Sequence, residues 1–271
     1  MNLNTIVEVK RPSSADQIGE WRDGYAWLAG GTWLFSEPQV ATDTLIDLES
    51  LGWPALTVTT DGLDIAATAK VVELHDFKGP AEWRAVPLFG DCIDAFLMSF
   101  KIWNAATVGG NVCMSLPAGA MISLTAALDG ICTLLPRSGS PRRVPVVDFV
   151  TGNHQNVLQK GELLRSIHLP ASALSKRYAM RQVSLTHLGR SAALIVGTVG
   201  DKGEDFFLTV SAATPRPVHL RFRKLPSVAE LRKALDEKLS PDAYFQDVHG
   251  SAPYKRHVTY YLAEQIRAEL A

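Results

Sequence analysis

The stretch that decides the fold is Lys101–Ala120, KIWNAATVGGNVCMSLPAGA. Its centre, residues 107–111 (TVGGN), sets two adjacent glycines between small hydrogen-bonding side chains, so the backbone can reach positive φ and lie against a ligand. Pro117 stands where a helix would begin, and residues 118–128 are almost wholly apolar. The pattern predicts a glycine turn, a polar loop and a buried helix. Backbone N–H groups gathered in such a turn favour a phosphate; an ordinary Gly-Gly turn is the alternative.

A second Gly-Gly loop, Gly30-Gly31-Thr32, follows an apolar stretch near the N-terminus. The strands expected around it are 7–10, 25–29 and 44–48, with a short helix whose capping box pairs Ser14 with Gln17. Loops at the carboxyl ends of strands commonly meet ligands in α/β units. Two such loops could hold the two phosphates of a dinucleotide from opposite sides. No GxGxxG or GxxxxGK[ST] occurs, which argues against a Rossmann domain and a P-loop.

Hydrophobic periodicity predicts the remaining elements. Asp61-Gly62 is the turn of a hairpin, and residues 88–102 form one amphipathic helix. Further strands are expected at 131–135, 144–147 and 161–170. After Ala171 the pattern predicts three strands (177–183, 191–199 and 206–213) and two helices, over 226–239 and from Ser251 onward.

Composition narrows the function classes. The 271 residues carry a net charge of −1 and a pI near 6.7, which advertises neither nucleic acid nor an acidic membrane surface. The longest apolar runs are too short to span a bilayer and no signal-peptide block begins the chain, so a cytoplasmic location is expected. Cys92, Cys113 and Cys132 are interpreted as buried free thiols, too few for a four-thiolate iron–sulfur cluster. No histidine spacing indicates a metal site.

Taken together, these motifs resemble the flavoprotein subunit of the molybdenum hydroxylases, the family of xanthine dehydrogenase and the carbon monoxide dehydrogenase medium subunit. The matching segments are 29–32 (AGGT), 102–111 (the family's IRNxATIGGN), 117–118 (SPAxD), 162–170 (ExLxxIxLP), 213–217 (A-x-x-P-R-P) and 254–257 (YRR). Their order and spacing agree with the family from about residue 5 to residue 265.

The resemblance implies an α+β fold class, with a two-part FAD-binding domain of the vanillyl-alcohol-oxidase (PCMH) type over residues 1–172, divided into 1–55 and 56–172. A small domain with a three-stranded antiparallel sheet and helices would follow over 173–271. The residues it assigns to FAD are Ala29, Gly30, Gly31, Thr32, Trp33, Thr107, Gly109, Gly110, Asn111, Ser115, Leu163 and Leu164. The two glycine loops would wrap the pyrophosphate, with neutral backbone donors in place of Lys or Arg.

The function so implied is electron transfer. Electrons from a molybdopterin-binding large subunit would pass through a 2Fe-2S small subunit to FAD and on to an external acceptor. No catalytic acid, base or nucleophile is expected, because the cofactor does the redox chemistry. Three departures from the family motifs, at Leu116, Ala120 and Met180, keep a flavin-free assembly subunit as an alternative. A stand-alone flavin oxidoreductase is another. The substrate, the final acceptor and the stoichiometry stay open.

Overall fold

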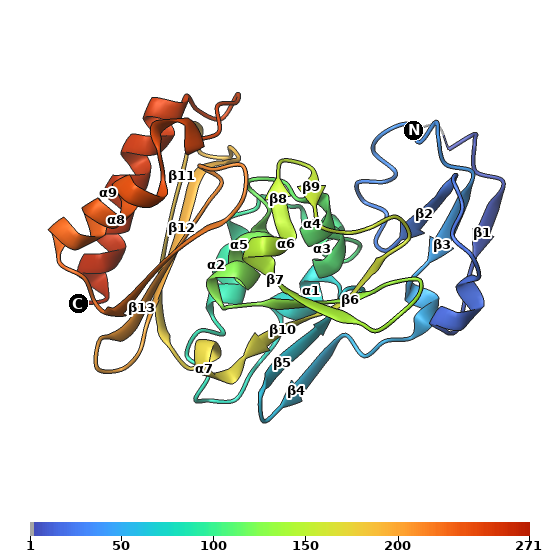
Figure 1. Ribbon diagram of the computed structural model, residues 1–271, viewed down its shortest axis with the longest axis horizontal. Helices are drawn as coiled ribbons and strands as arrows, with labels where there is room; N and C mark the ends of the chain where they lie inside the picture. The colour runs from blue at the N-terminus through green and yellow to red at the C-terminus, as the bar shows by residue number, and fades with distance from the viewer. Residues whose placement is uncertain (1–2) are drawn as a thin grey trace.

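The structure, a computed structural model, describes residues 3–271. Figure 1 shows three parts in a row: a small N-terminal sheet, a central sheet with helices packed over it, and a C-terminal sheet that carries two helices on its outer side. The chain passes through the three parts in order. The cavity described below lies where the first part meets the second.

The N-terminal sheet is parallel, with the strand order β1-β3-β2. Its elements are β1 (Glu8–Lys10), η1 (Ala15–Ile18), β2 (Tyr25–Leu28), β3 (Thr44–Asp47) and η2 (Glu49–Leu51). The capping box predicted at Ser14 is wrong, because the Ser14 side chain caps nothing and the Gln17 side chain accepts from the backbone N–H of Ser13 at 2.8 Å. Since β2 ends at Leu28, the chain leaves this sheet directly into the first glycine loop.

The central sheet is antiparallel, with the order β4-β5-β10-β6-β7. Its strands are β4 (Leu56–Thr59), β5 (Gly62–Ala66), β6 (Ile131–Leu135), β7 (Arg142–Pro145) and β10 (Leu163–Pro170). The middle strand pairs Ile167 with Ile65 on one side and with Cys132 on the other. The predicted hairpin at Asp61-Gly62 is confirmed by the pairing of β4 with β5.

Short helices and strands complete the central part: α1 (Val71–His75), α2 (Leu88–Asp94), α3 (Phe100–Trp103), α4 (Val108–Met114), α5 (Ala120–Ala127), α6 (Val146–Phe149), β8 (Val150–Gly152), β9 (Gln155–Asn156) and α7 (Ala171–Leu174). The single helix predicted over 88–102 is wrong. It breaks after Asp94, where Leu97 takes a left-handed φ of 53° that ends a right-handed helix, and Ser99 starts α3. Two residues of the predicted apolar stripe leave the core: Phe96 lines the cavity described below, and Phe100 is 68% exposed.

Helix α5 is the buried helix that the apolar run predicted. All eight of its residues are buried, because it contacts β12 and β13 of the C-terminal sheet as well as the helices α2 and α4 of the central part. Two hydroxyl groups meet across this contact, Ser123 Oγ and Ser211 Oγ, at 2.7 Å. The backbone N–H of Ala212 also donates to Pro117 O at 2.8 Å. These contacts fix the C-terminal sheet against the segment that follows the second glycine loop.

The C-terminal part has a four-stranded antiparallel sheet, β11 (Arg177–Ser184), β12 (Ser191–Val199), β13 (Glu204–Ser211) and β14 (Val218–Lys224). The three-stranded sheet expected from the sequence is therefore wrong. The missed strand, β14, buries Leu220 but points charged side chains such as Arg221 and Arg223 outward. It is an edge strand, and charges on an edge hinder pairing with another chain while they weaken the apolar pattern that identifies a strand.

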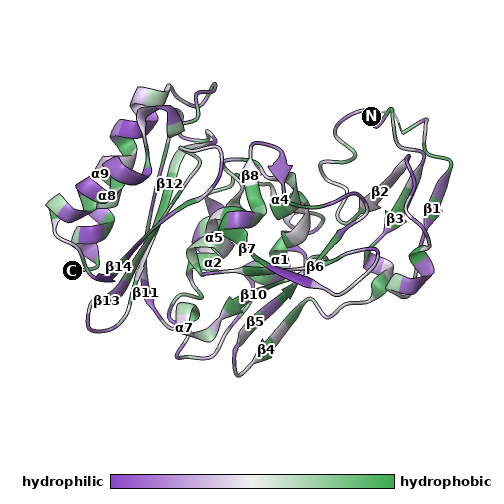
Figure 2. Cartoon of the chain, in the orientation of Figure 1, coloured by the Kyte–Doolittle hydropathy of each residue, from purple (hydrophilic) through white to green (hydrophobic). Residues whose placement is uncertain are grey.

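Helices α8 (Val228–Lys238) and α9 (Ala252–Glu269), with η3 (Pro241–Ala243) between them, cover this sheet. Figure 2 shows that both helices are hydrophilic on their outer sides, whereas the inner strands are largely hydrophobic. Leu194, Val196 and Ala212 pack into the core of the central part, so the second and third parts share apolar contacts. Within residues 3–271, no helix combines the length and the apolar character needed to cross a bilayer.

Candidate functional site

A cavity of about 390 Å³ lies between the N-terminal and central parts. Its wall is mostly apolar, and it contains both glycine loops and the start of β10. Of the residues predicted to hold a cofactor, the structure brings together Ala29, Gly30, Gly31, Thr32, Trp33, Thr107, Gly109, Gly110, Asn111, Leu163 and Leu164. A largely apolar cavity with a few convergent polar groups is the common form of a small-molecule site.

The first loop offers a row of free donors. In the described chain, residues 3–271, the backbone N–H groups of residues 30–34 donate to no protein acceptor. The loop packs closely on the backbone at Ala105. A Cβ on Gly30 would lie 1.9 Å from the backbone oxygen of Ala105, so only glycine allows the two segments to lie this close. Gly31 has a φ of 69°, and its carbonyl accepts from the N–H of Phe35 at 2.8 Å. Such consecutive N–H groups form an anion-binding concavity.

The second loop is built differently. The glycine turn predicted at residues 109–110 is wrong, because both glycines lie in the first turn of α4 without positive φ. Thr107 is the N-cap, and its Oγ1 accepts from the N–H of Gly110 at 3.0 Å. The N–H of Gly109 donates to Ala67 O at 3.0 Å. The backbone donors of residues 108–111 are therefore already bonded within the protein.

The two glycines of the second loop lack a side chain for different structural reasons. A Cβ on Gly109 would lie 2.4 Å from the Ala67 Cβ, so this glycine permits helix α4 to pack against the end of β5. A Cβ on Gly110 would meet Thr107 Oγ1 at 2.8 Å and no other atom within 4 Å. Since Gly110 lines the cavity, its open side faces the space that a ligand would fill.

Asn111 and Ser115 carry structural hydrogen bonds. Asn111 Oδ1 accepts from the N–H of Met121 at 3.1 Å, which joins α4 to α5. Ser115 is fully buried and does not line the cavity. It ends α4 with a φ of 52°, its Oγ donates to Val112 O at 3.2 Å, and Asn156 Nδ2 donates to that same Oγ at 3.2 Å. Thus the structure gives Ser115 a role in the fold and places it apart from the other predicted residues.

The wall also contains residues that were not among the predicted cofactor contacts. Trp27, Leu48 and Leu163 belong to one small apolar cluster and form one region of the wall. Phe96, Met98 and Leu116 form another region. Phe96 and Met98 were expected inside a single helix over residues 88–102, and Trp27 was expected only as part of a strand.

A second cavity of about 270 Å³ adjoins the first and shares Trp33, Phe96, Leu116 and Arg190 with it. Trp33 is 37% exposed and its ring centroid lies 5.5 Å from that of His154, which also lines the second cavity. The C-terminal part contributes Asp247 and His249. All three parts of the fold therefore meet at this second cavity, which no local sequence pattern reveals.

The charges at the cavity are few. Glu162 and Arg190 are the charged residues that line it, and Arg142 pairs with Glu162 at 2.6 Å. Arg190 makes no ion pair with any residue in the described range 3–271 and had no sequence signal beyond a lone charge between two strands. Cys113 also lines the cavity, and burial raises the pKa of its thiol to about 12, so the thiol stays protonated near neutral pH.

Of the three departures, Leu116 lines both cavities, Ala120 is buried in α5, and Met180 contacts Cys92 with 3.7 Å between the two sulfur atoms. Neither Ala120 nor Met180 reaches the first cavity.

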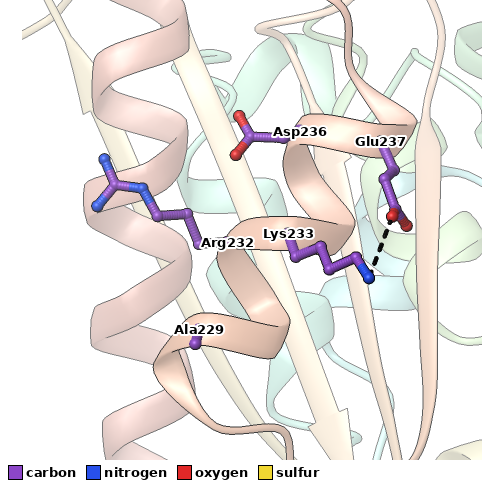
Figure 3. A pocket seen from close by; sticks show the side chains of 5 residues that line it. All are labelled: Ala229, Arg232, Lys233, Asp236 and Glu237. Carbon is purple, nitrogen blue, oxygen red and sulfur yellow. Dashed lines mark ion pairs between the residues drawn. The ribbon is translucent and has the colours of Figure 1, made fainter.

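A depression on the outer side of α8 is a weaker candidate (Figure 3). It is lined by the exposed helix side chains Ala229, Arg232, Lys233, Asp236 and Glu237. Lys233 pairs with Glu237 at 3.7 Å, and Asp236 pairs with Arg256 at 3.0 Å. Paired, solvated charges on one helix face do not form a site. In the part of the chain that the structure describes, no group of His, Cys, Asp and Glu side chains is arranged to hold a metal ion.

The cavity combines apolar walls with a loop of unbonded N–H groups, a combination that suits an anionic, partly apolar cofactor. A family model described as the FAD binding domain in molybdopterin dehydrogenase matches residues 5–172. The chain belongs to this family, FAD is the cofactor of the family, and the predicted relationship to the xanthine dehydrogenase type of oxidoreductase is confirmed.

Two relatives illustrate the relationship. The chain is 24% identical over 289 residues to the glyceraldehyde dehydrogenase medium chain of Sulfolobus acidocaldarius, with 98% of each chain covered. It is 29% identical over 126 residues to a xanthine dehydrogenase of Oryza sativa subsp. japonica, which is 42% of this chain but only 9% of that protein. The chain thus spans a small fraction of that longer relative.

The fold is shared with a solved structure, that of quinoline 2-oxidoreductase from Pseudomonas putida 86. The TM-score is 0.81 at 15% identity, over 100% of this chain and 98% of that one. The similarity extends over the C-terminal part as well as the cavity, and the expected α+β class is confirmed.

Proposed function

We propose that this chain is the FAD-carrying electron-transfer subunit of a molybdenum-containing hydroxylase or dehydrogenase. The observation that carries the proposal is the row of free N–H groups at residues 30–34, in a loop that lines the same cavity as the start of α4. Bound FAD supplies reversible two-electron and one-electron chemistry through its ring system. The residues of this chain would bind and orient it.

The pyrophosphate would lie against the N–H groups of the first loop, which offset its charge without a basic side chain. The second loop would contribute the open side of Gly110 and the hydroxyl of Thr107. Trp27, Leu48 and Leu163 suit the adenine, and the wall shared with the second cavity suits the ring system. We infer the vanillyl-alcohol-oxidase type of fold for residues 1–172, with parts 1–55 and 56–172, and a separate domain for 173–271.

Partners follow from the class of enzyme. Relatives include a protein named as a medium chain and another named as subunit beta of a caffeine dehydrogenase. We infer that a molybdopterin-binding large subunit and a 2Fe-2S small subunit complete this enzyme and that electrons reach FAD from the small subunit. Such an assembly would act in the cytoplasm.

The test is the visible spectrum of the purified chain, followed by titration with FAD. We expect a bound oxidised-flavin spectrum and saturable uptake. Gly110→Val should abolish uptake without unfolding the chain, because its side chain fills the cavity and meets little else. The departures from the family motifs at Leu116, Ala120 and Met180 keep a second candidate open, a flavin-free assembly subunit. Failure to take up FAD, alone and with the partner subunits co-expressed, would establish that candidate and overturn the electron-transfer proposal.

A further inference from the structure

Glu162 is an acidic residue in the wall of a cavity that is proposed to receive an anion. It lines the cavity beside Leu163 and Leu164, and its side chain is only 2% exposed. An unpaired buried carboxylate in this wall would repel an anionic ligand strongly, because solvent screens such charges poorly. A neighbouring group must therefore compensate the charge of Glu162 if the cavity is to accept an anion.

The Glu162 carboxylate is fully occupied by donors. Oε1 accepts from Arg142 Nε at 2.6 Å, and Oε2 accepts from Arg142 Nη2 at 2.6 Å and from the N–H of Gln159 at 3.0 Å. Arg142 Nη2 also donates to Val157 O at 2.7 Å. The arginine thus forms a two-pronged pair with the carboxylate and closes the turn 157–162 onto β7.

This turn supports the N-terminal part of the protein. The indole N–H of Trp27 donates to Glu162 O at 3.1 Å. A Cβ on Gly161 would lie 2.6 Å from the ring of Trp21, which itself packs on Trp27 with 4.5 Å between ring centroids. Since β2 runs from Tyr25 to Leu28 and then into the first glycine loop, the contact of Trp27 with the turn helps to set where that loop lies.

We propose that Arg142 is a positioning residue for the cofactor: it neutralises Glu162 and holds the turn 157–162, so that this wall of the cavity accepts an anionic dinucleotide. The inference rests on the proposed function, because it concerns the same cavity. Arg142 itself is absent from the cavity lining, so it acts through Glu162 and the turn. Arg190, the other charged residue of the lining, makes no ion pair with Glu162.

Removal of Arg142 predicts a distinctive pH signature. The groups that face the Glu162 carboxylate are the Arg142 guanidinium from β7 and the N–H of Gln159 from its own turn, and the guanidinium holds the pKa of the carboxyl below its usual range. Without the guanidinium, burial raises that pKa instead. The carboxyl is then neutral at mildly acidic pH and charged at higher pH, so FAD binding should weaken as the pH rises.

The experiment measures the dissociation constant of FAD for the full-length chain from about pH 5.5 to pH 8.5. For Arg142→Met we expect at least a tenfold weaker binding at the upper end, with recovery toward the lower end. The double variant Glu162→Gln/Arg142→Met should lose the pH dependence and regain the part of the affinity that the unpaired charge costs, while the loss from the released turn remains. Arg142→Lys keeps a positive charge and should show a small loss without pH dependence. Arg143→Met, an exposed arginine on the same strand, is the matched control.

Wild-type affinity for Arg142→Met across the pH range would overturn the inference. So would an equal, pH-independent loss in the single and double variants, which would indicate a packing role alone. If Arg142→Met does not fold, Glu162→Gln/Arg142→Met and Arg142→Lys still decide. The double variant should bind FAD more weakly than Arg142→Lys at every pH, and equal affinity of the two variants would overturn the inference. A wild-type chain that binds no FAD at any pH would instead contradict the proposed function, so the two failures are distinguishable.

Discussion

The two glycine loops look alike in sequence and differ in structure. In the loop at residues 29–34 the chain turns through a positive φ at Gly31 and leaves consecutive N–H groups free. In the loop at residues 107–111 the same Gly-Gly pair lies in a helical turn, and Thr107 and the end of β5 occupy its N–H groups. The first loop offers donors, whereas the second offers a surface without side chains. Similar motifs can therefore supply different chemistry to one ligand.

The largest expected effect separates the two glycines of the second loop. Gly109→Val should lower the free energy of unfolding by about 3 kcal/mol, because the new side chain overlaps Ala67 in a packed backbone contact. Gly110→Ala, the matched control, should change it by less than about 1 kcal/mol, since alanine is a better helix former and meets only the Thr107 hydroxyl. Urea denaturation measures both. Equal stability of the two variants would contradict the assigned packing role of Gly109.

The next prediction concerns the positive φ of the first loop. Gly31→Ala should cost about 2 kcal/mol, from the left-handed backbone and from overlap with the Phe35 ring at 2.5 Å, and should weaken FAD binding at least tenfold (about 1.4 kcal/mol). Gly52→Ala is the control: Gly52 also has positive φ but no neighbouring atom within 4 Å. That variant should lose about 1 kcal/mol of stability and keep its FAD affinity. Weaker FAD binding in both would mean that strain alone, and not the loop geometry, matters.

A smaller effect is expected at the cap of α4. Thr107→Val should destabilise the chain by about 1 kcal/mol, because the N–H of Gly110 loses its acceptor, and Thr107→Ser should restore most of that loss. Thermal unfolding of the three proteins measures the difference. If Thr107→Val is as stable as the wild type, the bond from the N–H of Gly110 to Thr107 contributes nothing. That N–H would then be available to a ligand, and the two loops would be more alike than the structure indicates.

The smallest expected effect concerns how readily an alkylating reagent reaches the cysteines. Cys113 lines the cavity, whereas Cys92 and Cys132 are fully buried in the central core. Burial raises the pKa of the Cys113 thiol to about 12, so alkylation near pH 8 should be slow, and saturating FAD should slow it further. Mass spectrometry of the alkylated chain resolves the three cysteines. Faster labelling of Cys132 than of Cys113 would contradict the placement of Cys113 on the cavity wall.

Much of the outline of the fold could be predicted from the sequence. The hairpin at Asp61-Gly62, the long strand that ends at Pro170 and the apolar helix after Pro117 were all correct, because local turn chemistry and hydrophobic periodicity specify them. Helix 88–102 and strand β14 failed for the opposite reason. The apolar periodicity continues through Leu97, although the backbone leaves the right-handed helix there, and the charges of the edge strand weaken its apolar pattern.

At the site, the sequence by itself determined where glycine was required and which family the chain joins. It could not determine which glycine serves the fold and which faces the ligand. Only the tertiary structure decided that Gly109 meets Ala67, that Ser115 turns into the core, and that Arg142 reaches Glu162 at the cavity wall. The physical reason is that the type of a residue limits the conformations of its own backbone. The atoms that surround that residue come from segments far away in the sequence.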